Sequence, residues 1–308
     1  MNLQQLRYLN EIVRCDLNIS DAANALFTSQ PGVSKQIKLL EEELGVELFV
    51  RNGKRIVAMT EPGKAALGIA QRLLRETENL KLVGEEFRTQ DSGSLTIATT
   101  HTQARYALPP IIKAFTQRYP NVKLGLHQGN PTQIAEQILS GEADIGIATE
   151  SLALYDELVT LPCYEWHHCV VVPPKHPLLQ EKKLTLKKLA QFPIITYDFA
   201  FTGRNKINQA FNAAGIEPNI ALTAIDADVI KTYVELGLGV GIVAQMAFVA
   251  DRDKQLKIID AGHLFQASTT RIAIRKNQYL RGFGYHFIEL FAPHLTREVV
   301  AQALHLST

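Results

Sequence analysis

The apolar residues near the N-terminus follow the spacing of two α-helices separated by a short turn. Four of them recur at intervals of four, three and four residues: Val33, Ile37, Leu40 and Leu44. This spacing places them on one face of a helix. Ser29 precedes the stripe as a favourable N-cap, Pro31 suits the first turn, and Gly45 stops the helix. Ser20 predicts the N-cap of a shorter helix just before it.

The next segment has the pattern of a two-stranded hairpin. Two short apolar runs flank Asn52-Gly53, a dipeptide that strongly indicates a two-residue hairpin turn. The hairpin carries three cations: Arg51, Lys54 and Arg55. A helix pair followed directly by a basic hairpin predicts an all-α winged helix-turn-helix domain over residues 1–59.

A long helix with a narrow apolar stripe is predicted over residues 60–89. Its first turn has a capping hydroxyl at Thr60 and a proline at Pro62. Seven residues then alternate at intervals of three and four: Ala66, Ile69, Leu73, Glu76, Leu80, Val83 and Phe87. A stripe two positions wide per heptad suits a partner helix, so we expect this linker helix to dimerise. Packing on its own domain is the alternative.

Beyond the polar linker QDSGS, the pattern changes to alternating strands and helices. Strands are expected at 95–99, 122–127, 144–148, 168–172, 194–197, 220–223, 240–243 and 270–275. Helices are expected at 104–118, 131–139, 184–190 and 283–294, and from residues 204 and 228. Such alternation predicts parallel sheets covered on both faces. We therefore expect a multidomain chain that ends in a two-lobed α/β domain over residues 90–308.

Composition narrows the class of protein. The chain has 308 residues, a net charge of +1 and 46% hydrophobic residues, which suits two or three packed units. Residues 1–60 hold seven basic and seven acidic side chains, so any binding of nucleic acid must come from local placement of charge. Three cysteines are too few for a disulfide framework. With neither a signal-peptide pattern nor an apolar run of about 20 residues, we expect a cytoplasmic protein without membrane association.

The polar face of the second helix is cationic in its N-terminal half. Residues 28–40 contain two lysines and no acid, whereas residues 41–43 are all glutamates. In the DNA major groove, Gln and Lys reach base edges and Ser reaches phosphate. We therefore expect a DNA-binding surface from this helix and the hairpin: Ser29, Gln30, Pro31, Ser34, Lys35, Lys38, Arg51, Lys54 and Arg55. A solvated amphipathic helix pair is the alternative for the helix-turn-helix pattern alone.

Hydroxyl groups follow the ends of several predicted strands. Thr100 and Thr102 come after the first strand, Thr149 after the third and Thr202 after the fifth, while Asn130 opens a capping box after the second. Helix N-termini at the carboxyl ends of parallel strands point backbone N–H groups into a crevice. The shared position of these groups predicts a site for a small anion between the lobes, although each threonine alone fits an ordinary N-cap.

The run from Ser29 to Ile37, SQPGVSKQI, resembles the recognition helix of the LysR-type transcriptional regulators, which typically opens Ser-Gln-Pro and continues Ser-Arg-Gln-Ile. Lys35 stands where many members have Arg, which exchanges a bidentate guanidinium for a point charge. Gly32 stands where members of that family more often have a small residue that carries a side chain. The resemblance implies dimerisation through the linker helix, homotetramers, and an effector domain with the periplasmic-binding-protein fold.

Five stretches resemble the cysteine-regulon (CysB-like) branch of that family: residues 99–109, 129–134, 161–164, 201–204 and 223–233. The resemblance covers essentially the whole chain and implies a regulator of sulfur assimilation and cysteine biosynthesis genes. It also implies that an acetylserine (N-acetylserine or O-acetylserine), sulfate or thiosulfate is the effector, held by Thr100, Thr102, Gln103, Thr149 and Thr202, with Tyr164 and Trp166 lining the cleft. For Trp166, simple core packing is the alternative.

The partners implied by this resemblance are promoter DNA, the effector, further copies of the chain and RNA polymerase. A regulator of another sulfur-related regulon, with a different effector, is the alternative within the family.

Two other classes of protein fit less well. Four histidines and two acids could be imagined in catalysis, but their spacing matches neither a metal site nor a nucleophile–base pair: His101, His127, His167, His168, Asp144 and Glu150. The glycine-rich run at 237–241 follows a helix and enters a strand, the reverse of a dinucleotide-binding loop. We therefore expect no catalytic residues, metal or cofactor. A transporter's solute-binding protein would require a signal peptide and would not need a basic wing.

Overall fold

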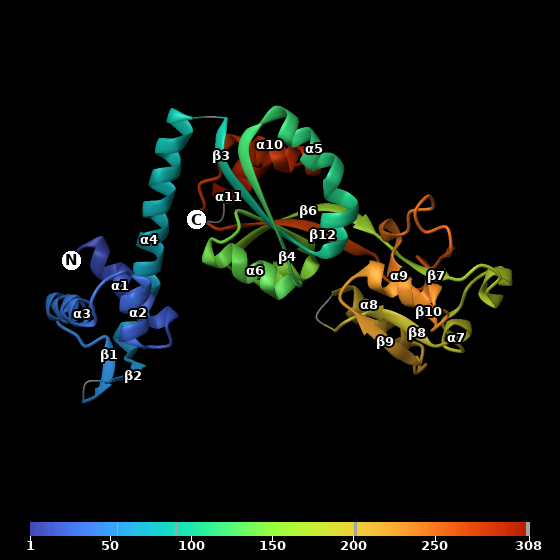
Figure 1. The fold of residues 1–308 in the computed structure, drawn as a ribbon, viewed down its shortest axis with the longest axis horizontal. Helices are drawn as coiled ribbons and strands as arrows, with labels where there is room; N and C mark the ends of the chain where they lie inside the picture. The colour runs from blue at the N-terminus through green and yellow to red at the C-terminus, as the bar shows by residue number, and fades with distance from the viewer. Residues whose placement is uncertain (54, 90, 200–201, 306–308) are drawn as a thin grey trace. The chain divides into compact units, whose positions relative to one another are not determined.

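The structure is a computed structural model that describes residues 1–53, 55–89, 91–199 and 202–305, with the backbone alone at Thr202 and His305 (Figure 1). Contacts between residues divide the chain into two units, Met1–Glu85 and Glu86–Thr308, and each is described by itself. Lys54 and the side chain of Thr202 lie outside the described part of the chain, so the roles expected for them stay predictions.

The first unit is the predicted winged helix-turn-helix. It contains helices α1 (Leu3–Arg14), α2 (Ile19–Ala25) and α3 (Gln30–Leu44), strands β1 (Phe49–Asn52) and β2 (Arg55–Met59), and most of helix α4 (Glu61–Arg88). The apolar stripe of α3 packs with residues of α1 and β1 in one core: Leu9, Ile12, Val33, Ile37, Leu40 and Phe49. All six are almost completely buried, which confirms the predicted stripe at Val33, Ile37 and Leu40, whereas its fourth residue, Leu44, is 43% exposed at the end of α3.

The helix ends follow local capping chemistry, with one correction. The Ser29 hydroxyl accepts a hydrogen bond from the backbone N–H of Gly32 at 3.3 Å, and Gly45 ends α3 with φ of 69°. The prediction that Ser20 caps the preceding helix was wrong. Asn18 is the N-cap, because its side-chain oxygen accepts from the backbone N–H groups of Ser20 and Asp21 at 3.0 and 3.3 Å.

Strands β1 and β2 pair in the antiparallel sense expected of the hairpin. Asn52 lies opposite Arg55 at the end of β1, so Asn52 belongs to the strand and not to the turn predicted at Asn52-Gly53. Gly53 has φ of 62°, the left-handed conformation that a tight hairpin turn requires and that glycine adopts without steric cost.

The second unit consists of two α/β lobes. In the first lobe the strand order is β4-β3-β5-β12-β6. These strands are β3 (Ser92–Thr99), β4 (Asn121–Gln128), β5 (Ile145–Thr149), β6 (Leu158–Trp166) and β12 (Ser268–Arg275). The helical elements of this lobe are η1 (Gln103–Ala107), α5 (Leu108–Arg118), α6 (Pro131–Ser140), η2 (Glu150–Leu154), α10 (Gly282–Phe291) and α11 (Arg297–His305). Helices α5, α10 and α11 cover one face of the sheet and α6 covers the other.

In the second lobe the strand order is β11-β7-β10-β8-β9. The strands are β7 (His168–Val172), β8 (Ile194–Tyr197), β9 (Ile220–Ala224), β10 (Val240–Ala244) and β11 (Lys257–Asp260). The helical elements are η3 (Pro177–Gln180), α7 (Leu186–Leu189), α8 (Thr202–Ala213), α9 (Ala227–Glu235) and η4 (Gln245–Ala247). Helix α8 packs on one face of this sheet and α9 on the other. The chain passes between the lobes after β6 and again before β12.

The sheets are mixed rather than purely parallel as predicted. Strands β3, β4 and β5 run parallel, as do β8, β9 and β10, but β12 is antiparallel to both of its neighbours and so is β7. Strand β6 was not predicted at all. It contains Pro162, which weakens a strand signal, and it lies at the edge of its sheet, where a missing N–H is tolerated.

The helix expected at 104–118 is interrupted near its start. Residues Gln103–Ala107 form a π-helical turn before α5 begins. Pro109 and Pro110 follow this turn, and neither can donate the backbone hydrogen bond that would continue a regular α-helix through it. The wider turn carries Gln103, Arg105 and Tyr106, whose contacts are described below.

Candidate functional site

The polar face of α3 is open to solvent at the positions predicted to contact DNA. Six of the predicted positions lie on α3 or its N-cap. Five of them have exposed or half-buried side chains that carry hydrogen-bond donors: Ser29, Gln30, Ser34, Lys35 and Lys38. Pro31 is exposed beside them. The amide of Gln30 donates to the Ser34 hydroxyl at 3.3 Å, and Lys38 lies 3.7 Å from Glu42. The structure thus brings these residues to one surface, and their contact with DNA stays a prediction.

The hairpin is anchored to α3 by one carboxylate. Glu41 accepts hydrogen bonds from the backbone N–H groups of Leu48 and Phe49 at 2.9 and 3.3 Å, and it lies 3.1 Å from the guanidinium of Arg51. Arg51 therefore helps to fix the wing on α3, a contact that the sequence did not indicate. Arg55 is exposed on β2 and remains open for a phosphate.

The stripe along α4 is only partly covered within the chain. Ala66 packs against the core of the first unit. Further along the helix, Ile69, Leu73, Leu80 and Phe87 are 51%, 42%, 72% and 82% exposed. An apolar row of this kind favours a partner helix over packing on its own domain.

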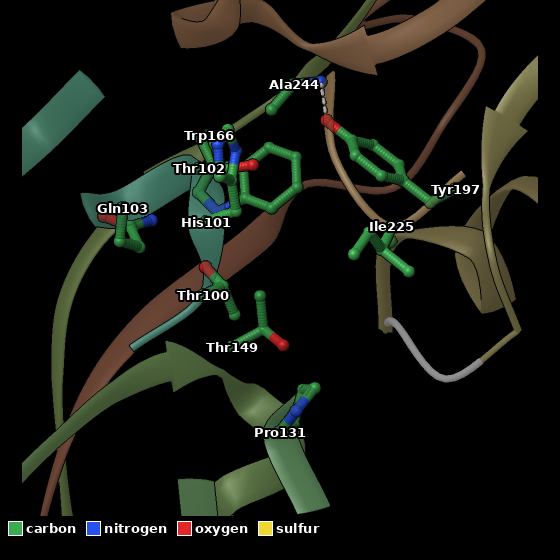
Figure 2. Close-up of a pocket in the computed structure, with 11 residues that line it drawn as sticks. Thr100, His101, Thr102, Gln103, Pro131, Thr149, Trp166, Tyr197, Ile225 and Ala244 are labelled. Atoms are coloured by element: carbon green, nitrogen blue, oxygen red, sulfur yellow. Dashed lines mark hydrogen bonds between the residues drawn. The ribbon is translucent and has the colours of Figure 1, made fainter. Parts of the chain in front are cut away.

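A pocket of about 40 Å³ opens in the second unit, where the carboxyl ends of the parallel strands of both lobes meet (Figure 2). It is lined by Thr100, His101, Thr102, Gln103, Pro131, Thr149, Trp166, Tyr197, Gly203, Ile225 and Ala244. Five of these were named from the sequence: Thr100, Thr102, Gln103, Thr149 and Trp166. The segment after β3 supplies four lining residues, and helices α6 and α8 begin at or next to the wall. Hydroxyls and helix N-termini therefore do converge on one space, as the strand ends predicted.

Gln103 is held rigidly at the wall of the pocket. It is 3% exposed, its amide N–H donates to the Thr270 hydroxyl at 3.1 Å, and its carbonyl accepts from the hydroxyl of Tyr164. Tyr164 thus lies behind Gln103, packs against Phe291 with ring centroids 5.8 Å apart, and is not among the residues that line the pocket. In place of the predicted lining role, the structure shows Tyr164 orienting a lining residue.

Tyr197 closes the pocket from the second lobe. Its hydroxyl accepts from the backbone N–H of Ala244 at 3.0 Å, and it also shares a hydrogen bond with Thr102 from the first lobe. Burial raises the pKa of Tyr197, so the ring stays a neutral phenol. Tyr197, Ala244 and Ile225 were missed by sequence reasoning because they come from the second lobe, and their place opposite Thr102 depends on how the lobes fold together.

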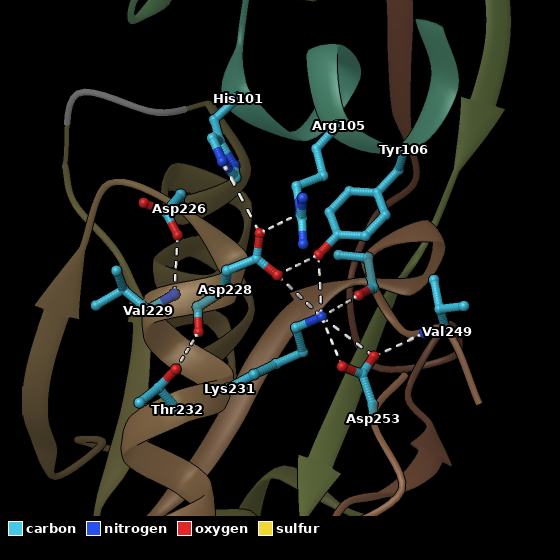
Figure 3. Close-up of polar contacts among 11 residues, drawn as sticks. His101, Arg105, Tyr106, Asp226, Asp228, Val229, Lys231, Thr232, Val249 and Asp253 are labelled. Carbon is cyan, nitrogen blue, oxygen red and sulfur yellow. Dashed lines mark hydrogen bonds and ion pairs between the residues drawn. The ribbon is translucent and has the colours of Figure 1, made fainter. Parts of the chain in front are cut away.

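A cluster of polar and charged groups, buried at Lys231 and Asp253 but partly open to solvent at Arg105 and Asp228, also joins the lobes beside the pocket (Figure 3). We call it the inter-lobe cluster: Arg105, Tyr106, Asp228, Lys231 and Asp253. The Tyr106 hydroxyl donates to Asp228 at 2.6 Å, and Arg105 lies 2.6 Å from the other oxygen of the same carboxylate. Lys231 donates to Tyr106 at 2.9 Å and to Asp253 at 2.9 and 3.1 Å. Two residues of the π-turn in the first lobe are thereby tied to α9 in the second.

The charges in the inter-lobe cluster compensate one another. Burial lowers the pKa of Lys231, but its hydrogen bonds to Tyr106 and Asp253 outweigh this and raise the pKa overall. Burial likewise opposes ionisation of Asp228, while Tyr106 and Lys231 lower its pKa below the usual value. The sequence held one signal for this cluster. Lys231 lies four residues after Ala227 and three before Val234, on the buried stripe of its helix, where a lysine requires an acidic partner.

One trio of potential metal ligands lies within the described residues. Suitable atoms of His101, Asp226 and Asp228 are all within 4.8 Å of one another. Asp228 is already bound by Arg105 and Lys231, and these two cations oppose a metal ion at the same carboxylate. The ion pairs of Asp228 in the inter-lobe cluster therefore account for the closeness of these three side chains without a metal ion.

A winged helix-turn-helix joined by a long helix to a two-lobed domain with an inter-lobe pocket defines a ligand-responsive DNA-binding regulator. Residues 3–64 match the family model of the bacterial regulatory helix-turn-helix protein, lysR family, and residues 88–296 match the LysR substrate binding domain. The chain belongs to the LysR family of transcriptional regulators. Members of this family bind promoter DNA and small-molecule effectors, and they are regulators rather than enzymes.

Three sulfur-related regulators are similar to this chain over nearly its full length. The chain is 57% identical over 304 residues to the HTH-type transcriptional regulator SsuR of Burkholderia cenocepacia, with 99% of each chain covered. It is 55% identical over 304 residues to CysB of the same organism, covering 99% of this chain and 97% of that one. It is 49% identical over 290 residues to the regulator cbl of Escherichia coli, covering 94% and 92%.

Solved structures agree with this placement. The crystal structure of the cofactor-binding domain of the Cbl transcriptional regulator is 46% identical and superposes with a TM-score of 0.67, covering 69% of this chain and 93% of that one. A full-length OxyR variant from Pseudomonas aeruginosa is 20% identical with a TM-score of 0.65, covering 96% and 98%, and shares the fold. Within the described residues, no helix is long and apolar enough to cross a membrane.

Proposed function

We propose that this protein regulates genes of sulfur assimilation and cysteine biosynthesis, and that a small anionic effector bound in the inter-lobe pocket controls its activity. The effector is an acetylserine (N-acetylserine or O-acetylserine), sulfate or thiosulfate. The observation that carries the proposal is the pocket itself, in which threonine hydroxyls and helix N-termini converge without any acidic lining residue among those described. Such neutral donors and helix-end partial charges suit a small anion.

Sequence similarity supports the choice of regulon. Relatives named SsuR, CysB and cbl are 49–57% identical over nearly the whole chain. The second candidate function is control of another sulfur-related regulon through a different effector. Sequence similarity supports this candidate too, because SsuR and CysB are almost equally similar to this chain.

DNA binding is assigned to α3 and the wing, in a dimer formed through α4. The exposed side chains of Gln30 and Lys35 and the half-buried Ser34 lie outside the core of the first unit and suit the major groove. Leu80 and Phe87 supply an uncovered seam for a second copy of α4. We further propose that the dimers pair into homotetramers and that the protein contacts RNA polymerase. We expect the protein to act in the cytoplasm. Closure of the lobes on the effector would alter how dimers pack and hence how the paired recognition helices hold DNA.

The effector is tested by thermal unfolding of the full chain with each of the four anions. A ligand at 100 times its dissociation constant stabilises by about 2.7 kcal/mol, which moves the midpoint visibly. Thr102→Ala should abolish the shift, whereas Thr116→Ala, an exposed threonine on α5, should leave it unchanged. Stabilisation that persists in Thr102→Ala would show that the anion binds elsewhere. No shift with any of the four would exclude them as effectors.

A further inference from the structure

Five exposed lysines lie between β7 and β8 of the second lobe. Residues 175–188 hold these five and a single acid, Glu181, whereas the whole chain of 308 residues has a net charge of only +1. We call the set the lysine patch: Lys175, Lys182, Lys183, Lys187 and Lys188. So many cations on one short segment produce a local positive potential, which attracts polyanions.

The core of the second lobe holds this segment in place. Three of its leucines are 0–2% exposed and pack with the residues of the sheet: Leu178, Leu184 and Leu189. The carboxylate of Glu181 lies 3.0 Å from the ammonium group of Lys188, so the chain between them forms a closed loop. This loop carries Lys182, Lys183 and Lys187, whose positive charges therefore lie close together on a fixed part of the surface.

The fold itself makes little use of these ammonium groups. Among the described residues, Lys188 is the only member of the patch with an ion pair. Lys175 is the third residue of a turn in which the backbone N–H of His176 donates to the carbonyl of Pro173 at 3.2 Å, and its φ is 70°. Glycine or asparagine is usual at such a position, because other residues are strained there. A lysine that stays exposed at a strained position indicates a role outside the fold.

The surface predicted to read DNA has few free cations of its own. Arg51 lies 3.1 Å from Glu41, and Lys38 lies 3.7 Å from Glu42. Of the cations assigned to this surface within the described residues, two have no acidic partner: Lys35 and Arg55. Proteins that bind DNA tightly commonly neutralise about 6–10 phosphates. Further phosphate contacts are therefore expected from another part of the protein.

The residue types of the patch favour a polyanion over a protein partner. Protein interfaces are enriched in aromatic residues and arginine and depleted of lysine. Residues 175–188 contain no arginine, tryptophan, tyrosine or phenylalanine, and the most exposed leucine among them, Leu179, is only 38% exposed. Lysine ammonium groups suit phosphates, which they contact as point charges.

We infer that the lysine patch is a second DNA-binding surface, which contacts the phosphate backbone beside the bases read by α3. The inference rests on the binding of promoter DNA, which is common to the family, and it requires no effector. It goes beyond the proposed function, because it adds contacts that do not depend on base sequence. Phosphates carry no base identity, so these contacts strengthen binding to all DNA sequences alike.

The inference is tested by fluorescence anisotropy of the full chain on promoter DNA and on unrelated DNA of the same length, over a range of salt concentrations. The triple variant Lys182→Gln, Lys183→Gln, Lys187→Gln removes three charges and keeps the pair of Lys188 with Glu181. Each lost phosphate contact lowers the slope of log affinity against log salt by about 0.9, so the slope should become shallower by about 2–3 for each bound protomer. Both DNAs should lose affinity by the same factor, so the preference for the promoter stays unchanged.

Two matched variants separate phosphate contacts from a change in net charge. The triple variant Lys113→Gln, Lys254→Gln, Lys257→Gln removes the same charge from exposed positions outside the patch and should leave the slope unchanged. Arginine at the three altered patch positions keeps the charges and should keep the slope of the unaltered protein. All the altered lysines are exposed, so the thermal midpoints of the variants should match that of the unaltered protein.

A shallower slope that is confined to the patch variant with glutamine, and is the same for both DNAs, supports the second surface. An unchanged slope in that variant, an equal decrease in the variant outside the patch, or a loss of affinity for the promoter alone would overturn the inference. A membrane partner would give a different result. The unaltered protein would then sediment with vesicles of phosphatidylcholine and phosphatidylserine, the patch variant would not, and the DNA slopes of the two would agree, which also overturns the inference.

Discussion

Lys231→Met is the most direct perturbation of the inter-lobe cluster. The side chain of Lys231 is 7% exposed, and its ammonium group serves Asp253, Asp228, Tyr106 and a backbone carbonyl. Methionine has a similar length and shape but no charge. The substitution leaves Asp253, itself 10% exposed, buried without its cation. Removing one partner of a buried pair costs about 3–5 kcal/mol, so we expect the free energy of unfolding to fall by that amount.

Asp228→Asn should cost much less, although it changes the same cluster. Lys231 keeps Asp253 and the carbonyl of Ala247, and the asparagine side chain can still accept from the Tyr106 hydroxyl. The loss is then close to that of one hydrogen bond, about 1 kcal/mol. Comparing the two decreases in the free energy of unfolding therefore shows whether Asp253 or Asp228 is the main partner of Lys231.

Both variants can be measured by urea unfolding of the full chain, followed by the fluorescence of Trp166. This is the only tryptophan, and it lies in the second unit, so the signal reports the two-lobed domain. Lys187→Met, on the exposed side of α7, is the control and should change stability by less than about 0.5 kcal/mol. A Lys231→Met protein within about 1 kcal/mol of the unaltered one, or no less stable than Asp228→Asn, would refute the reasoning.

Three further predictions test other parts of the molecule. Lys35→Ala should abolish specific promoter binding and reduce the slope of log affinity against log salt by about one, measured by fluorescence anisotropy; unchanged binding would contradict the assignment of α3. Leu80→Asp should yield monomers in light scattering, whereas Leu154→Asp, a change at a leucine in η2 that is even more exposed, should not; intact oligomers would rule out the α4 seam. His168 has a folded-state pKa of about 3 against 6.5 when unfolded, so only the unfolded chain gains its proton as the pH falls. Its contribution to stability should therefore drop by about 2 kcal/mol between roughly pH 7.5 and pH 5, and His168→Phe should remove that drop in urea titrations at the two pH values; an unchanged slope would show that His168 is not the group responsible.

Local signals predicted the DNA-binding unit almost residue by residue. Ser29, Gly45 and Gly53 act within a few residues of themselves, through a cap, a left-handed helix end and a tight turn. One local error, Ser20 in place of Asn18, exchanged two residues with similar capping chemistry, and another assigned Asn52 to the hairpin turn although it belongs to β1. The apolar row of α4 was likewise predictable, because helical periodicity needs no knowledge of what lies beyond the helix.

The sequence also predicted which type of side chain lies at the strand ends that form the pocket. Parallel strands bring their carboxyl ends to one edge, which is why the sequence alone predicts that Thr100, Thr102 and Thr149 lie together. The sequence could not show that Tyr164 turns away to hold Gln103, because that contact spans 61 residues and depends on where β6 pairs with β12.

Tertiary structure alone decided how the two lobes meet. The bond from Tyr106 to Asp228 joins residues 122 apart, and the approach of Trp166, at the end of β6 in the first lobe, to Gly203 of α8 depends on how the two lobes pack. Such contacts follow from the packing of whole sheets and helices, for which the spacing of residues along the chain carries little information. The sequence therefore determined the elements, the class of protein and the chemistry at the strand ends, while the folded domain decided which of those groups are hydrogen-bonded, buried or left facing the pocket.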